Sequence, residues 1–275
     1  MLLNSMNNAL SKDLISLMPL INNWWTNKTI SELYLTTWYG AYENDEFVVF
    51  DTETKWFRDE IIEIGAIIVK NNKIKNKNWK FYDYSYYINN NGEKKWEMDA
   101  FAFFVYPAIP EIPEFITELT HIDMKIIEDG LQPWAKDPNR TLPDFVTAFT
   151  QFIDFIWNRT IIAHNARFDT WIFRWSLKYF YDDINRSIRN QDHPLTLAKV
   201  KQFFSLNVID TLTEAQRAMT LNPNINYKNS TLSDFFWLPS NEALLHRAVY
   251  DVIFTTRNFY WLYEYTGSTY ENIWY

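Results

Sequence analysis

The chain contains no cysteine, and this absence removes several kinds of chemistry at once. Disulfides, cysteine-containing zinc sites, iron–sulfur clusters and thiol nucleophiles are all excluded. Any metal ion must therefore be bound by oxygen atoms or by imidazole nitrogens. The lack of cysteine also permits a reducing compartment.

Glycine and long apolar runs are scarce as well. Five glycines occur, at positions 40, 65, 92, 130 and 267. No two lie close enough to form a phosphate-binding loop of the Walker or Rossmann type, which excludes those two nucleotide-binding folds. No apolar run approaches the roughly 18 residues of a membrane span, and the N-terminus lacks the features of a signal peptide. We therefore expect a cytoplasmic protein with no membrane partner.

Positive charge is in the minority. Lys and Arg number 26 against 34 Asp and Glu, so the net charge is −8. This balance argues against a large basic surface that binds nucleic acid nonspecifically, but it is compatible with a nuclease that has a local site. Hydrophobic residues make up 47% of the chain and aromatic residues 19%, which is ample for a well-buried core.

The composition divides the chain into two parts. Residues 1–45 are rich in Asn, Leu and Trp, with apolar residues at helical spacing between Leu10 and Ile21 and an interruption at Pro19. This part is interpreted as an N-terminal helical extension. It packs on the main domain in the favoured interpretation, and docks on a partner such as a polymerase in the other. Residues 46–275 are predicted to form one domain of catalytic size.

The pattern from residue 46 onward predicts the order β-β-β-α-β-α-β-α. The first three strands are expected to form a meander, and the later strands to pair in parallel. Residues 89–105 and 181–203 are expected to be loop-rich insertions. Strands are predicted at 47–50, 61–69, 79–88, 160–163 and 205–209, and helices at 145–156, 169–179 and 243–265.

The first candidate for chemistry is a pair of carboxylates at the end of the first predicted strand. Asp51 and Glu53 are separated by one residue, so the two-residue period of a strand places both on one face. Hard cations such as Mg²⁺ prefer oxygen ligands, and the carboxyl ends of strands open onto a crevice. The same Asp-x-Glu pattern is also common on solvated strand faces.

Two further segments carry polar groups next to predicted elements. Residues 164–169 follow a buried strand, and there Asp169 is either a site carboxylate or a helix cap. His246 and Asp251 lie near the start of the last helix, about 140° apart around it. That offset suits a carboxylate that binds metal and an imidazole that reaches the substrate, although His246 is equally compatible with a structural role.

At these residues the chain resembles the DnaQ-like, or DEDD, 3′-to-5′ exonucleases, including the proofreading domains of epsilon type. The resemblance covers about residues 47–262. The segments that carry it are Phe50-Asp51-Thr52-Glu53-Thr54, Glu60-Ile61-Ile62-Glu63-Ile64-Gly65-Ala66, Glu118-Leu119-Thr120, Ile161-Ile162-Ala163-His164-Asn165-Ala166-Arg167-Phe168-Asp169, Val208-Ile209-Asp210-Thr211-Leu212 and His246-Arg247-Ala248-Val249-Tyr250-Asp251.

The resemblance implies an α/β fold of the ribonuclease H type, with a mixed β-sheet flanked by helices. It implies two divalent metal ions, Mg²⁺ or Mn²⁺, with His246 as the general base. The histidine branch of the family is indicated, because Arg247 occupies the position at which the other branch has tyrosine. The residues that would bind metal are Asp51, Glu53, Asp169 and Asp251.

The resemblance also implies residues that contact the substrate: Thr52, Thr54, His164, Asn165 and Phe168. An apolar wedge against the terminal base is assigned to Phe57 or Trp56. This chain departs from the family pattern there, with Lys55-Trp56-Phe57, and again at His121, where glycine is usual.

The predicted function is metal-dependent 3′-to-5′ exonuclease activity on single-stranded 3′ ends, which releases 5′-mononucleotides. DNA proofreading beside a DNA polymerase is the leading form of this hypothesis. The alternatives are an exoribonuclease that trims RNA or degrades oligonucleotides, and a catalytically idle module that binds nucleic acid or a polymerase.

Overall fold

The computed structural model of the chain describes residues 46–56, 60–70, 100–130, 144–184, 195–219, 226–235 and 246–271. The extension predicted for residues 1–45, the strand predicted at 79–88 and the side chain of Phe57 lie outside these ranges. The described strands are β1 (Glu46–Thr54), β2 (Ile61–Lys70), β3 (Ala100–Phe104), β4 (Thr160–Ala163) and β5 (Val208–Asp210). The described helices are α6 (Glu114–Thr120), α7 (Met124–Gly130), α8 (Asp144–Ile156), α9 (Ala166–Tyr179), α11 (Leu197–Phe203), α12 (Thr211–Ala218), α13 (Asn229–Phe235) and α14 (Ala248–Glu271).

The five described strands form one mixed sheet in the order β3-β2-β1-β4-β5. β2 pairs antiparallel with both β1 and β3, whereas β4 pairs parallel with β1 and with β5. The predicted antiparallel pairing of the first two strands and parallel pairing of the later strands are therefore confirmed, whereas the third strand of the meander is β3 at Ala100–Phe104 rather than the segment predicted at 79–88. β1 lies at the centre of the sheet, so a side chain at its carboxyl end has elements on every side.

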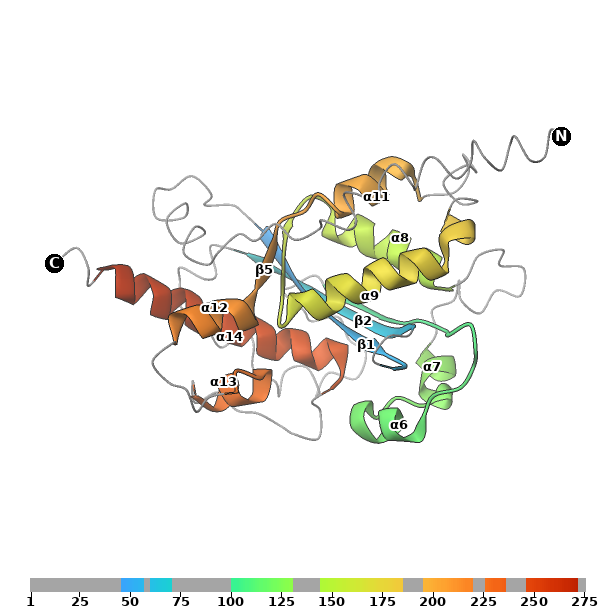
Figure 1. Cartoon of the computed structure of the whole chain (residues 1–275), viewed down its shortest axis with the longest axis horizontal. Helices are drawn as coiled ribbons and strands as arrows, with labels where there is room; N and C mark the ends of the chain where they lie inside the picture. The colour runs from blue at the N-terminus through green and yellow to red at the C-terminus, as the bar shows by residue number, and fades with distance from the viewer. Residues whose placement is uncertain are drawn as a thin grey trace.

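Helices cover both faces of the sheet, as Figure 1 shows, with α8, α9 and α11 on one side and α12, α13 and α14 on the other. The alternation of β1 explains this, because Val48 and Phe50 belong to the core under α8 and α9, and Phe47 and Val49 to the core under α14. Phe50 lies 6.2 Å from Phe173 of α9 between ring centroids. The predicted ribonuclease H-like arrangement of a mixed sheet flanked by helices is confirmed.

The prediction of a loop-rich insertion at residues 89–105 is wrong at its C-terminal end, because residues 100–104 form β3. The short run Ala-Phe-Ala-Phe-Phe gives little periodic signal by itself. Its Phe101 is 6% exposed and lies 5.4 Å from Phe152 of α8 between ring centroids. Tertiary packing on α8 thus makes a strand of a segment that the sequence pattern left as loop.

Three other predictions need correction. The insertion expected at 181–203 contains α11, whose N-cap Thr196 accepts a hydrogen bond from the backbone N–H of Lys199. α9 begins three residues earlier than predicted, and α14 begins at Ala248 rather than near residue 243. Both starts follow a residue in the left-handed region, Asn165 with φ 61° and His246 with φ 65°, which cannot continue a right-handed helix.

Among the described residues, no helix has the length and apolar character needed to cross a membrane.

Candidate active site

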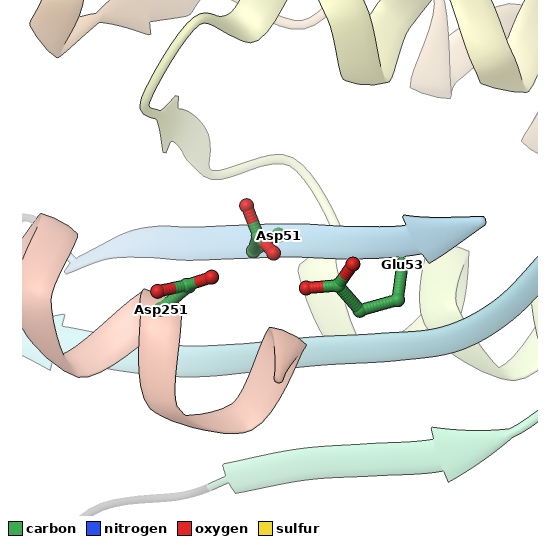
Figure 2. A group of neighbouring side chains, drawn as sticks. All are labelled: Asp51, Glu53 and Asp251. Atoms are coloured by element: carbon green, nitrogen blue, oxygen red, sulfur yellow. The ribbon is translucent and has the colours of Figure 1, made fainter. Parts of the chain in front are cut away.

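Three carboxylates from two elements meet at the carboxyl end of β1. Each of Asp51, Glu53 and Asp251 offers one oxygen, and these oxygens all lie within 4.8 Å of one another. Figure 2 shows Asp51 and Glu53 projecting from β1 toward Asp251, which lies in the first turn of α14. All three side chains are partly buried. The predicted convergence of these residues is therefore what the structure shows.

A glycine allows α14 to approach the sheet this closely. Gly65 of β2 pairs with Asp51 across the strands. A β-carbon at Gly65 would lie 2.5 Å from the carbonyl carbon of Ala248 and 2.6 Å from the backbone nitrogen of Val249. These are backbone atoms that cannot move aside, so only glycine permits this contact. The start of α14, and with it Asp251, is thereby held beside β1.

His246 lies just outside the first turn of α14, with its side chain exposed. Its backbone N–H donates a hydrogen bond to Oδ2 of Asp251 at 3.1 Å, which ties the two residues together. Partial burial of the ring, with the charges of Lys228 and His121, lowers the pKa of His246 below its ordinary value of 6.5. The imidazole is consequently neutral near pH 7 and able to accept a proton.

Asp169 is set back from the other carboxylates and is not part of the group within 4.8 Å. It lies in the first turn of α9, is 2% exposed, and accepts a hydrogen bond at 2.7 Å from the hydroxyl of Thr52. The N-cap position of α9 belongs to Asn165, so the alternative of Asp169 as a cap is wrong. Asp169 nevertheless acts on the cluster, because its charge is the largest carboxylate contribution to the raised pKa of Asp51.

Burial and mutual repulsion raise the pKa of every carboxyl in the cluster. The pKa values of Asp51 and Glu53 are well above their ordinary values, first because of burial and then because of neighbouring carboxylates. Burial likewise raises the pKa of Asp169 and of Asp251 to about 7. Such a cluster is stable as anions only beside cations, and its all-oxygen donor set matches Mg²⁺ or Mn²⁺. The residues present therefore fit divalent metal ions.

The residues predicted to contact the substrate differ in accessibility. Thr52 and Thr54 are 4% and 8% exposed, and the hydroxyl of Thr52 is already bonded to Asp169. Burial lowers the pKa of His164 to about 4, and its Nδ1 lies 3.0 Å from Oγ1 of Thr211. Asn165 is exposed, whereas Phe168 is partly buried against the core under α9. Substrate contact by these residues stays a prediction.

A buried ion pair lies beside the cluster, and the sequence motifs alone did not predict it. Glu63 of β2 is 2% exposed and lies 2.9 Å from the guanidinium of Arg247, which immediately follows His246. A signal for it was present, because Glu63 is the one charged residue within the apolar run of residues 61–69. A charge inside a buried strand requires a partner.

The exonuclease family RNase_T matches residues 48–259, which is more than half of the chain. The chain therefore belongs to the exonuclease family, and is of the DnaQ-like 3′-to-5′ type that its motifs indicated. It is 32% identical over 219 residues to a DNA polymerase III PolC-type of Caldanaerobacter subterraneus subsp. tengcongensis, covering 78% of this chain. It is 31% identical over 150 residues to the PolC-type polymerase of Clostridium perfringens, covering 54% of this chain. The matched regions span only 11% and 8% of these two relatives.

Solved structures of exonucleases are similar to this chain at low sequence identity. Exonuclease X in complex with 5′ overhanging duplex DNA is 18% identical with a TM-score of 0.46, and the match covers 80% of this chain and 93% of that one. The nuclease domain of 3′hExo, a DEDDh family member bound to rAMP, is 12% identical with a TM-score of 0.48, covering 80% and 90%.

Proposed function

We propose that the chain is a metal-dependent exonuclease that removes 5′-mononucleotides from single-stranded 3′ ends of DNA, and that it proofreads beside a DNA polymerase in the cytoplasm. The observation that carries the proposal is the meeting of Asp51, Glu53 and Asp251 within 4.8 Å, with His246 bonded to Asp251 through its backbone. Membership of the exonuclease family supports the reaction class.

The carboxylates of Asp51, Glu53 and Asp251 would hold two divalent ions, Mg²⁺ or Mn²⁺. Asp169, which lies outside that group of three, would be a fourth ligand. When bound, such ions supply a lowered pKa for the attacking water and charge neutralisation at the leaving oxygen. The raised pKa values of the carboxyls support this assignment, because a cation would remove the repulsion that raises them.

His246 would accept the proton of the attacking water. His246 is exposed just before the first turn of α14, and its lowered pKa keeps the imidazole neutral. The hydrogen bond from its backbone to Asp251 fixes the start of its side chain relative to one of the proposed metal ligands. This arrangement suits a general base that must stand within reach of a water beside the cluster.

Two exposed aromatic rings next to the site would stack on bases of the substrate strand. Trp56 is 51% exposed and follows Glu53 by three residues, so its Cα lies within roughly 11 Å of that residue's Cα. Phe115 of α6 is 45% exposed and meets Trp56 edge to face, with 4.7 Å between ring centroids. Base stacking tolerates any sequence, as an exonuclease requires. Of the two residues assigned to the wedge, Trp56 is the one within the described ranges.

The choice of DNA and of a polymerase partner is supported by the two relatives described as DNA polymerase III PolC-type. An acidic chain with net charge −8 binds a phosphate backbone weakly by itself. A partner that holds the DNA would supply the missing affinity. We therefore expect low processivity for the isolated chain.

The test is digestion of single-stranded DNA and RNA of matched sequence, labelled at the 3′ or at the 5′ end. The protein is assayed with Mg²⁺, with Mn²⁺ and with EDTA, beside Asp51→Asn and the surface control Asp154→Asn. Asp154 lies on α8, is 51% exposed and pairs with Lys199, away from the cluster. DNA shortened from its 3′ end with metal, by the native chain and the control but not by Asp51→Asn, supports the proposal.

Two other results would redirect it. Faster digestion of RNA would assign the chain to the exoribonuclease alternative. No digestion of either substrate by folded protein that binds Mn²⁺ would favour the idle binding module.

A further inference from the structure

β1 and β2 place two glutamates side by side at the edge of the cluster. Glu53 pairs with Glu63 in the antiparallel register, so both side chains project from the same face of the sheet. Glu63 is 2% exposed and its charge contributes to the raised pKa of Asp51, Glu53 and Asp251. Two like charges directly opposite each other are destabilising unless a cation neutralises one of them.

Arg247 supplies that cation in a fixed geometry. Its Nε donates to Oε2 of Glu63 at 3.1 Å and its terminal nitrogen donates to Oε1 at 2.9 Å. The backbone N–H of Ala248 donates to Oε2 at 2.9 Å, so both carboxylate oxygens are occupied. The guanidinium also lies over the ring of Phe104, 5.3 Å from its centroid. The fork of an arginine can make this paired contact, whereas the single ammonium of lysine cannot.

The pair also anchors the segment that carries the proposed base and a proposed ligand. Arg247 and Ala248 lie between His246 and Asp251, and both bind the same carboxylate of β2. His246 keeps a left-handed backbone with φ 65°. Holding the next two residues to Glu63 fixes where that turn ends and where the first turn of α14 begins. The anchor thus sets the position of His246 and Asp251 relative to β1.

We propose that Arg247 and Glu63 are positioning residues. Their ion pair holds His246 and Asp251 over β1, and Arg247 keeps Glu63 from joining the metal-binding carboxylates. The kinetic part of this inference rests on the proposed exonuclease function, and the metal-binding part does not. Arg247 acts on Glu53 as well, because its charge opposes the rise in the pKa of that carboxyl. Removal of Glu63 alone would leave the arginine charge directed at Glu53.

The test compares Glu63→Gln, Arg247→Lys and the double variant Glu63→Gln/Arg247→Met with the native chain. Mn²⁺ binding is measured by calorimetry without substrate, and kcat and KM are measured with single-stranded DNA. Thermal unfolding reports the stability of each variant. The matched control is Glu46→Gln, which removes an ion pair with Arg159 at the opposite end of β1, where the two side chains are 30% and 20% exposed.

We expect Glu63→Gln to weaken Mn²⁺ binding about tenfold or more and to lower kcat on a similar scale. The double variant, which removes both charges but also the anchor of Asp251, should bind Mn²⁺ more tightly than Glu63→Gln and less tightly than the native chain, while kcat stays low. Arg247→Lys keeps the charge and loses the fork, so it should lower kcat about tenfold at nearly unchanged Mn²⁺ affinity and KM. Glu46→Gln should change stability alone.

Native Mn²⁺ affinity in folded Glu63→Gln would overturn the inference. So would a double variant that binds Mn²⁺ as poorly as Glu63→Gln, because a purely structural pair gives that result. If Glu63→Gln does not fold, the kcat of Arg247→Lys tests the inference instead. A native kcat in that variant would refute the positioning role. If the native chain digests no nucleic acid, the proposed function fails and the Mn²⁺ comparison still tests the charge separation.

Discussion

Asp169→Asn is expected to stabilise the metal-free protein while it abolishes activity. Asp169 is 2% exposed, and burial raises the pKa of its carboxyl from 3.8 to about 7. The amide of asparagine has nearly the same shape and retains an oxygen that accepts the hydrogen bond from Thr52, which is 2.7 Å long in the native chain. The substitution therefore removes the charge and keeps the contact.

The size and sign follow from the difference in pKa between the folded and unfolded states. A rise from 3.8 to about 7 is about three units, which corresponds to at most about 4 kcal/mol at pH 8. Because neighbouring carboxyls share the strain and titrate together, we expect about 2 kcal/mol. Between pH 4 and pH 7 the folded chain binds more protons than the unfolded chain. Its free energy of unfolding therefore falls as the pH rises through that window, and falls less steeply in Asp169→Asn.

Urea denaturation in EDTA at several pH values between 4 and 8 measures both effects, with the exposed Asp182→Asn as control. Adding Mn²⁺ should stabilise the native chain more than Asp169→Asn, because metal ions that neutralise the cluster leave less strain to relieve. Equal stability of Asp169→Asn and the native chain in EDTA at pH 8, with the same pH slope, would refute the reasoning. It would mean that Asp169 is not a strained anion in the metal-free fold.

Gly65→Ala should lower the free energy of unfolding by about 1–3 kcal/mol in urea denaturation and reduce kcat, because its β-carbon would meet the backbone of Ala248 at 2.5 Å; native stability would contradict the close approach of α14. His246→Gln should lower kcat by about 10²–10⁴-fold with Mn²⁺ affinity unchanged in calorimetry, as expected for loss of a general base, and an unchanged rate would require another base. Trp56→Ala should raise KM for single-stranded DNA about fivefold or more at constant kcat, on the scale of one lost base stack. Trp157→Ala, at a tryptophan that is 61% exposed just after α8, is the matched control and should leave KM unchanged.

Much of the sheet was predictable, because its signals are local. The apolar runs of β1, β2 and β4 are long or clearly bounded, and the alternation of β1 alone predicts that Asp51 and Glu53 share a face. The order of the chain motifs predicted that Asp251 would join them. The two-residue period of a strand and the order of the family motifs along the chain were sufficient to predict these features.

The remaining features depend on contacts that no local pattern encodes. β3 forms because Phe101 packs on α8, and α14 begins at Ala248 because His246 takes a left-handed backbone. The setback of Asp169 depends on the start of α9, three residues earlier than predicted, and on the hydroxyl of Thr52 from the opposite face of β1. Each depends on two elements that meet only in the folded chain.

A list of the acidic residues at the site does not by itself distinguish the proposed metal ligands from their neighbours. Glu53 and Glu63 stand opposite each other, project from the same face and both lie beside the cluster. Burial does not assign their roles, since the more buried of the two is the one withdrawn from the site. What separates them is Arg247, which occupies both oxygens of Glu63 with the help of the Ala248 N–H. In the proposed site, the position of Arg247 beside five carboxylates would therefore determine which of them remain available to a metal ion.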